Sequence, residues 1–231
     1  FMVDDSGRMS STTFEVKEKD MKNAKAYVLT IEPYPDSDPN PSSVHILAGD
    51  FSGNTANLSV AHSSAFGNDF SSAAGSYILA TPTDGGGATD ELSGVWWLDP
   101  AQGPGPGLTL PGLASGWAYE GWVVIDGIPV TTGKFLSASG ADQSAPYSGP
   151  VAGPPFPGED FLVNAPMGLT FPTDLSGKTV VISIEPSPDN SPLPFSLKPL
   201  VGNVPNPATD HTSYPMTNIA AQTNPTGTVY R

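Results

Sequence analysis

Short apolar runs, rich in β-branched and aromatic residues, recur along the chain and are separated by Gly, Pro, Asn and Asp. Runs of this length and composition are typical of β-strands. No segment keeps the i, i+3, i+4, i+7 apolar spacing of an amphipathic helix over three turns, so any helix is expected to be a single turn. The pattern predicts eleven strands, at residues 26–32, 44–48, 56–61, 75–81, 94–98, 107–110, 120–125, 130–135, 169–171, 179–185 and 195–201.

Eleven short strands suit an all-β protein of the β-sandwich type, joined by long Pro/Gly-rich loops. These loops have β-type runs on both sides, so we interpret them as connections within a domain and not as hinges between domains. The sequence therefore predicts one β-sandwich domain at 26–202, preceded by a partly ordered arm at 1–25. The Asn-, Pro- and Thr-rich stretch at 203–231 is expected to be extended and to wrap the surface or fray.

An internal repeat links two distant parts of the chain. Residues 27–49 and 180–202 are identical at 11 of 23 positions when aligned at an offset of 153 without gaps. Each copy has a strand, the sequence Glu-Pro-x-Pro-Asp, a Pro-rich loop and a second strand that closes on Gly. Proline ends a strand ladder because it has no N–H, and the following Asp can accept backbone N–H groups in a turn. The repeat predicts two structural strand-loop-strand units related by a pseudo-two-fold axis; two equivalent ligand sites are the alternative.

Composition narrows the class further. The 231 residues include 25 Gly and 26 Pro, yet 38% of the chain is hydrophobic, which is enough for a packed core and argues against collagen-like or wholly disordered chains. Nine basic residues against 23 acidic ones give a formal charge of −14, which repels the phosphates of nucleic acid. Such a surface keeps a protein soluble, and it also suits divalent cations or a basic partner.

Several kinds of chemistry are excluded by residue counts. The sequence has no Cys, so it forms no disulfide, thiolate metal site or Cys nucleophile, and its three His residues lack a metal-binding spacing. No apolar stretch is long enough to span a membrane. Because the sequence begins at Phe1 with a polar segment, we expect that a leader, or a lipid-modified cysteine directly upstream, was removed or omitted.

Two sets of side chains invite a functional interpretation. Glu32 and Glu185, each followed by Pro, suggest the paired carboxylates of a glycosidase, but a carboxylate at a strand end more commonly caps loop N–H groups. All four Trp lie within residues 96–122, where they could form a sugar-stacking face or anchor the core of a sandwich that lacks a disulfide. Adjacent Trp96 and Trp97 are expected on opposite faces of a strand, one in the core and one near the surface.

Acidic loops offer oxygen ligands of the kind that Ca²⁺ prefers, at residues 36–38, at Asp84 with 90–91, and at 159–160. The complete EF-hand loop, the nucleophile elbow, the phosphate-binding Gly-rich loops and the zincin helix do not occur. We therefore assign no catalytic residue, metal ligand or cofactor from the sequence.

One stretch resembles a known family. Residues 108–135, LTLPGLASGWAYEGWVVIDGIPVTTGKF, are followed by VVISIEP at 180–186. The order of an L-P-x-L-x-x-G lead, an aromatic-x-x-W strand, D-G-x-P-V-x-x-G-x-F and a strand ending in Glu-Pro is similar to the extracytoplasmic C-terminal domain of the anti-sigma-K factor family. The resemblance covers about residues 92–202, and the segment 27–49 repeats its Glu-Pro unit.

The resemblance implies a β-sandwich on the outer side of the cytoplasmic membrane of a bacterium. In the family this domain is attached to a transmembrane helix and a cytoplasmic sigma-binding segment, and neither occurs within this sequence. The resemblance predicts a non-enzymatic binding or signalling module that is located in the periplasm, at the cell surface or outside the cell. Its expected partner is a protein of the cell envelope, and it is not expected to bind nucleic acid. The expected interaction surface comprises Glu32, Asp36, Glu185, Asp189, Trp117, Tyr119 and Trp122.

Two other classes remain open. One is a cell-surface module that binds carbohydrate or depends on Ca²⁺. The other is a glycosidase that uses Glu32, Glu120 or Glu185.

Overall fold

The computed structural model describes residues 10–231 except 12, 14, 33, 34, 88, 102 and 190. The predicted all-β class is confirmed. The described residues include only two α-helices, each of four residues, α1 (Glu18–Met21) and α2 (Ala220–Thr223), and one 3-10 turn, η1 (Glu91–Ser93). No helix in this described part is long and apolar enough to cross a membrane.

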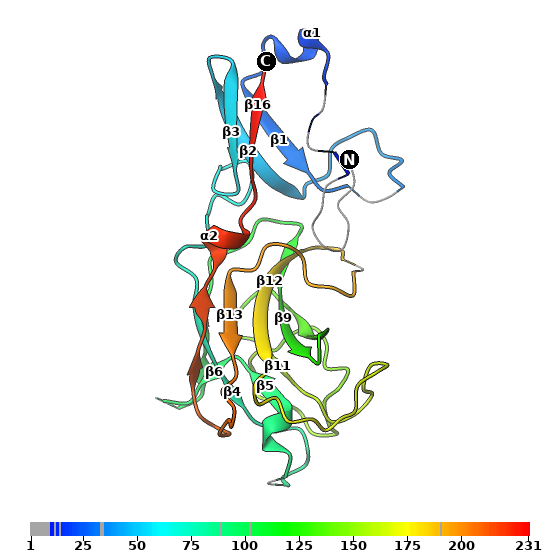
Figure 1. Ribbon diagram of the computed structural model, residues 1–231, viewed down its shortest axis with the longest axis vertical. Coiled ribbons are helices and arrows are strands. Elements are labelled where there is room, and N and C mark those ends of the chain that lie inside the picture. Colours follow the sequence, from blue (N-terminus) through cyan, green and yellow to red (C-terminus); the bar gives the residue numbers. More distant parts are fainter. Residues whose placement is uncertain are drawn as a thin grey trace.

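An N-terminal sheet lies at one end of the long axis of the molecule (Figure 1). Its order is β1-β2-β3-β16, and all its pairs are antiparallel. The strands are β1 (Ala26–Thr30), β2 (His45–Ser52), β3 (Thr55–Ser59) and β16 (Thr226–Tyr230).

A central sheet contains the hairpin β9–β10 and the strand β12. Its order is β10-β9-β12-β13-β15, again antiparallel. The strands are β9 (Trp117–Ile125), β10 (Ile128–Phe135), β12 (Thr179–Pro186), β13 (Leu200–Asn203) and β15 (Thr217–Asn218). β9 and β10 form a hairpin, and β9 pairs with β12 over eight consecutive residues.

A third sheet packs against the central one. Its order is β11-β5-β4-β14, with β8 paired to β4, and a short pair β6-β7 lies beside it. The strands are β4 (Ala74–Leu79), β5 (Gly94–Trp96), β6 (Leu98–Asp99), β7 (Gly105–Pro106), β8 (Leu108–Thr109), β11 (Gly158–Asp160) and β14 (Tyr214–Pro215).

Close approach between the central and third sheets builds the sandwich. A Cβ atom on Gly121 of β9 would lie 2.4 Å from the Trp97 ring, and one on Gly202 of β13 would lie 2.7 Å from the Tyr77 ring. Glycine therefore lets these large rings pack directly on the backbone of the facing sheet. One contiguous apolar core contains these rings and extends to Leu47 and Leu58 of the N-terminal sheet.

The internal repeat is present in the structure with its register preserved. Val28 faces Ala48 across β1 and β2, and Val181 faces Val201 across β12 and β13. Each residue of the second pair is 153 positions after its counterpart in the first. We refer to the two hairpins and their loops as the N-terminal unit (residues 25–51) and the central unit (residues 178–204).

Two of the predicted strands need correction. Residues 169–171 form no strand, because Leu169 N–H turns back onto the Pro166 carbonyl. The strand predicted at 195–201 begins only at Leu200, since Pro199 offers no N–H and Lys198 N–H bonds to the Thr223 hydroxyl. The short strands β11, β14 and β15 and the five-residue strand β16 were not predicted.

Residues before and after the predicted domain at 26–202 also form secondary structure. Residues 1–9 of the predicted arm lie outside the described part of the chain, and the later part of that arm contains α1. The segment 203–231 adds β14, β15 and β16 to the edges of the third, central and N-terminal sheets.

Candidate functional site

The glutamates of the two repeat units make the same contact. Glu185 Oε1 accepts the Phe195 N–H at 2.8 Å, and Glu32 Oε1 accepts the Ser42 N–H at 3.0 Å. Ser42 and Phe195 are again 153 positions apart. Each carboxylate therefore closes its own Pro-rich loop, as the capping interpretation predicts.

The aspartates of the repeat hold the turn in the same way. Asp36 Oδ1 accepts the Asp38 N–H at 2.9 Å, and Asp189 Oδ1 accepts the Ser191 N–H at 2.8 Å. Because Glu32 follows β1 of the N-terminal sheet, Glu185 lies in β12 of the central sheet and each caps its own loop, the geometry does not support a catalytic pair of these two residues.

Glu120 of β9 comes close to Glu185 and Asp189 instead, with carboxylate oxygens within 4.8 Å of one another. We refer to these three residues as the acidic cluster. Lys134 of β10 lies beside it, with Nζ 3.0 Å from Asp189 Oδ2 and 3.8 Å from Glu120 Oε2. The ammonium group thus supplies the positive charge that a metal ion would bring to such a cluster.

Burial dominates the electrostatics of the acidic cluster. Glu120 is 4% exposed and Glu185 is 1% exposed. Desolvation raises the pKa of Glu185 to about 7 and also raises the pKa of Glu120. The Thr131 hydroxyl donates to Glu120 Oε1 at 2.5 Å, whereas Glu120 Oε2 has no hydrogen-bond partner. A solvent-borne substrate does not reach these carboxyl groups in this conformation.

The aromatic part of the expected interaction surface lies inside the protein. Trp117, Tyr119 and Trp122 are each 2% exposed. The first two face the main core, and the Trp122 indole points to the other side of β9 and donates to Ser183 Oγ at 2.8 Å. The Ser183 hydroxyl donates in turn to Glu185. These rings therefore anchor the sandwich and offer no face to a ligand.

Trp96, the last residue of β5, and Trp97, which follows it, point to opposite sides as expected, but the prediction that one lies near the surface is wrong. Trp97 belongs to the main core and Trp96 to a second small cluster with Phe156. The segment leading to β11 covers Trp96, because Gly153 lies so close that a Cβ there would be 2.4 Å from the ring.

The acidic residues at 159–160 also form hydrogen bonds inside the protein. Asp160 accepts the Thr83 N–H and the Trp96 indole N–H, each at 2.7 Å, and Glu159 accepts the Tyr147 N–H at 3.3 Å. Both carboxylates are fully buried. Burial raises the pKa of Glu159 to about 7.

Sequence reasoning missed two residues in these contacts. Asp142 accepts the Gly158 N–H at 3.0 Å, and burial raises its pKa to about 7. Lys134 was missed as well, although a signal existed: it is the only Lys or Arg between residues 26 and 177.

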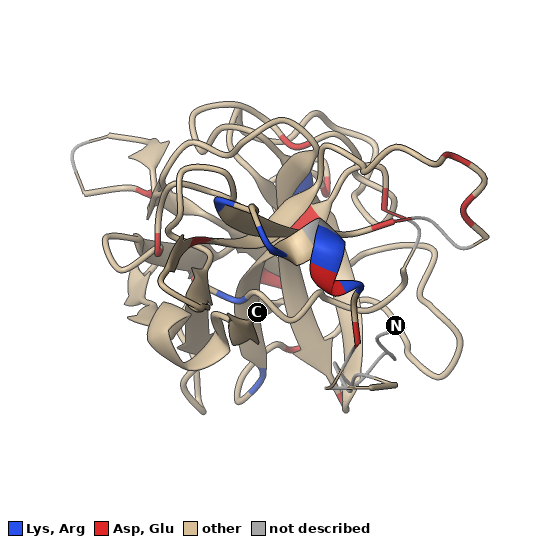
Figure 2. Ribbon diagram, turned by 90° about the horizontal axis from the view of Figure 1, so that it is seen from above, with Lys and Arg blue, Asp and Glu red and all other residues tan. Residues whose placement is uncertain are grey.

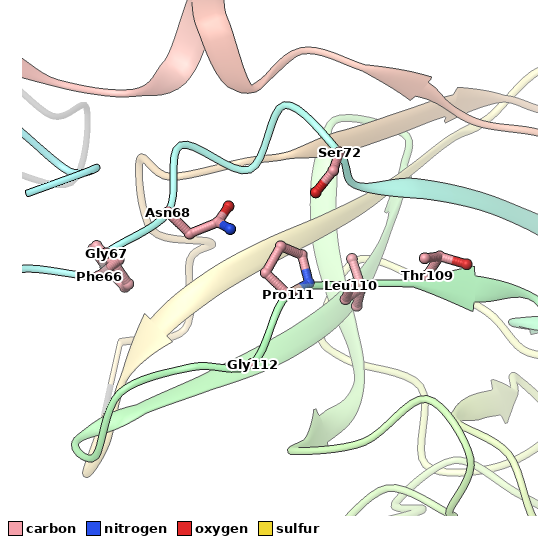
Figure 3. Close-up of a pocket in the computed structure, with 8 residues that line it drawn as sticks. All are labelled: Phe66, Gly67, Asn68, Ser72, Thr109, Leu110, Pro111 and Gly112. Carbon is pink, nitrogen blue, oxygen red and sulfur yellow. The ribbon is translucent and has the colours of Figure 1, made fainter. Parts of the chain in front are cut away.

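Two open hollows lie on either side of the segment Thr109–Gly112. One, of about 390 Å³, has Asn68 and Ser72 on one side and Leu110 and Pro111 on the other (Figure 3). The second, of about 470 Å³, extends toward residues 136–139. The Tyr119 hydroxyl donates to the Pro111 carbonyl at 2.7 Å and fixes the segment between them.

No family model, curated protein or solved structure matches this chain.

The chemistry of the hollows follows from their lining. Hydroxyl and apolar side chains line both hollows, the first also has the Asn68 amide, and none of the lining residues is charged. Such a surface suits an uncharged ligand that combines hydroxyl groups with apolar patches.

Proposed function

We propose that this protein is a non-enzymatic binding and signalling module that acts outside the cytoplasm, similar to the sensor domain of an anti-sigma factor. The observation that carries the proposal is that the carboxylates of both repeat units serve as hydrogen-bond acceptors within their own loops. In both units the Glu and the Asp hold backbone N–H groups of a loop, so the conserved geometry of the repeat is that of a scaffold.

The placement of the family motif supports the same proposal. The pieces at 117–135 and 180–186 are far apart in sequence, yet they form three adjacent strands, β10, β9 and β12. The Glu-Pro end of β12 lies opposite Trp117 and Ala118. A motif whose separate pieces meet in one sheet describes a fold unit, as the resemblance implies.

The buried state of the nearest carboxylate pair argues for a module without hydrolytic activity. A glycosidase needs two carboxyl groups that flank an accessible bond. Glu120 and Glu185 are close together but buried, and the neighbours of their oxygens are Thr131 and Lys134 at Glu120 and the Phe195 N–H at Glu185.

Transcript profiling of cells with and without the gene tests the signalling function. We expect its loss to change the transcription of a small set of operons that share one promoter sequence, with restoration by the intact gene. A transcript profile that does not change under any envelope stress would overturn the proposal. A fusion of alkaline phosphatase, which is active only outside the cytoplasm, to the end of the gene product tests the location.

A carbohydrate-binding function is the second candidate, and the uncharged hollows beside Thr109–Gly112 favour it. A glycan array probed with and without Ca²⁺ distinguishes it from signalling through a protein partner. Binding that Asn68→Ala weakens would support it, and the absence of any bound glycan would remove it.

A further inference from the structure

The two repeat units differ at one strand edge. In the central unit, β12 pairs with β13 on one side and with β9 on the other. In the N-terminal unit, β1 pairs with β2, and no strand among the described residues pairs with its other edge. The hairpin β9–β10 thus completes one copy of the unit, and the described structure provides no counterpart for the other.

The backbone of β1 is oriented to accept a strand there. The Lys25 carbonyl accepts the Phe51 N–H and the Ile31 N–H donates to Val44, so odd-numbered residues face β2. Residues 26, 28 and 30 therefore direct their N–H and C=O groups to the open edge. The Val204 N–H bonds to Lys178 in the same way, which places the edge of β12 that binds β9 at the equivalent position.

Charges at both ends of this edge match those of the completed unit. At the start of β12, Lys178 Nζ lies 2.5 Å from Asp126 in the β9–β10 turn, and beyond its end Asp189 binds Lys134 of β10. The equivalents of Lys178 and Asp189 are Lys25 and Asp36, and neither has an ion-pair partner within the described part of the chain. Figure 2 shows this end of the molecule, where acidic residues are spread over the loops and α1 bears both signs.

We propose that the open edge of β1 binds a β-hairpin of a partner protein by strand addition. The hairpin runs antiparallel to β1, places an acidic residue of its turn at Lys25 and presents a Lys or Arg of its outer strand to Asp36. This inference rests on the binding function proposed above and names the surface and the chemistry of its partner. Backbone hydrogen bonds supply affinity, and the two charges fix direction and register.

A labelled peptide of residues 117–135 is the probe, because this sequence already completes the central unit. We expect it to bind the full chain, as measured by fluorescence anisotropy. Val28→Pro removes the N–H at the middle of the open edge but spares the bonds to β2, so affinity should fall at least about tenfold. Val28→Ala keeps the N–H and should stay within about twofold of the unsubstituted chain.

A charge swap provides a test that does not depend on proline. Lys25→Glu combined with Asp36→Lys should weaken binding about fivefold, and a peptide with Asp126→Lys and Lys134→Glu should recover it. Equal binding to all variants, or no binding, would overturn the proposal. A dimer of the unliganded chain that V28P abolishes would overturn it in favour of pairing between two copies. These results are independent of the transcription test, because that test measures the effect of losing the whole gene and not binding at the β1 edge.

Discussion

Individual carboxylates decide much of the local structure. Glu32 and Glu185 make the same hydrogen bond at equivalent positions, but Glu185 is buried beneath its loop and Glu32 remains partly exposed. The repeat therefore contains a natural comparison of one contact in two environments. A lost acceptor costs more where water cannot replace it.

Replacement of Glu185 by Ala should lower the free energy of unfolding by about 2–3 kcal/mol, because it leaves the Phe195 N–H and the Ser183 hydroxyl without an acceptor. Glu185→Gln keeps the acceptor oxygen and should retain most of the stability. Glu32→Ala should cost clearly less than Glu185→Ala. Urea unfolding at about pH 5, where Glu185 is protonated in the folded protein, measures all three, and equal losses at the two sites would contradict the role of burial.

Stability should decrease as the pH rises from about 4.5 to about 7. Asp142, Glu159 and Glu185 have their pKa raised to about 7 in the folded protein by burial. The folded state thus holds these protons more tightly than the unfolded state, and this advantage is complete below the unfolded pKa and lost as the pH passes the folded one. For Glu185 the change is roughly 3 kcal/mol.

Thermal unfolding across this pH range measures the effect. The Tm should be higher at pH 5 than at pH 8, and Glu185→Gln should flatten the curve because Gln does not titrate. A Tm that rises steadily with pH up to 8 would contradict the prediction.

At the scale of strands and sheets, glycine and tryptophan act together. Trp97 packs on Gly121 of the facing sheet, and Trp96 lies against Gly153 and Gly158. The high glycine content is in part a consequence of burying two adjacent indoles that point in opposite directions at the end of β5.

Gly121→Ala should destabilise the protein by about 1–3 kcal/mol through overpacking, since the new methyl group would meet the Trp97 ring and the Thr132 hydroxyl. Gly140→Ala is the matched control, because no heavy atom lies within 4 Å of a Cβ there. Urea unfolding gives both free energies. Equal stability of the two variants would show that the sheets can separate without cost.

The sequence predicts the longer elements well for a physical reason. The run at 120–125 identifies most of β9, and the repeat identifies the β1–β2 and β12–β13 hairpins twice. The strands β14 and β15 have too few residues to show a pattern, and β16, TGTVY, lacks the apolar run that marks the predicted strands.

In the candidate site too, local contacts were predicted from the sequence and contacts between distant segments were not. Capping by Glu32 and Glu185 is local and follows from the Glu-Pro sequence. The contact of Lys134 with Asp189 requires the register of three strands, β10, β9 and β12, which local patterns do not contain. Burial of Trp96 likewise depends on a segment more than fifty residues away.

At the scale of the whole molecule, the C-terminal segment joins the sheets. β14, β15 and β16 each pair with a different sheet, and the Arg231 guanidinium lies over the Phe51 ring and donates to the Gly53 carbonyl. The N-terminal sheet therefore depends on residues from both ends of the chain (Figure 1).

A chain that ends at residue 225 should lose hydrogen-exchange protection in β1, β2 and β3 while β9 and β12 remain protected. The reason is that β3 loses its partner β16, whereas the central sheet keeps all its strands. Arg231→Ala is the control, because it removes the side-chain contacts and leaves β16 in place. Exchange followed by mass spectrometry resolves the segments, and uniform loss of protection would show that the sheets unfold as one unit.

The pairing of β16 with β3 also sets the order in which the protein can be built. The strands β1, β2 and β3 precede the other strands along the chain, yet the ladder at Ser59 is complete only when Thr226 is in place. The part of the fold that is made first is thus finished last. Contacts so distant in sequence slow folding and leave a strand edge exposed in the nascent chain, so this edge is the natural place for a chaperone to act.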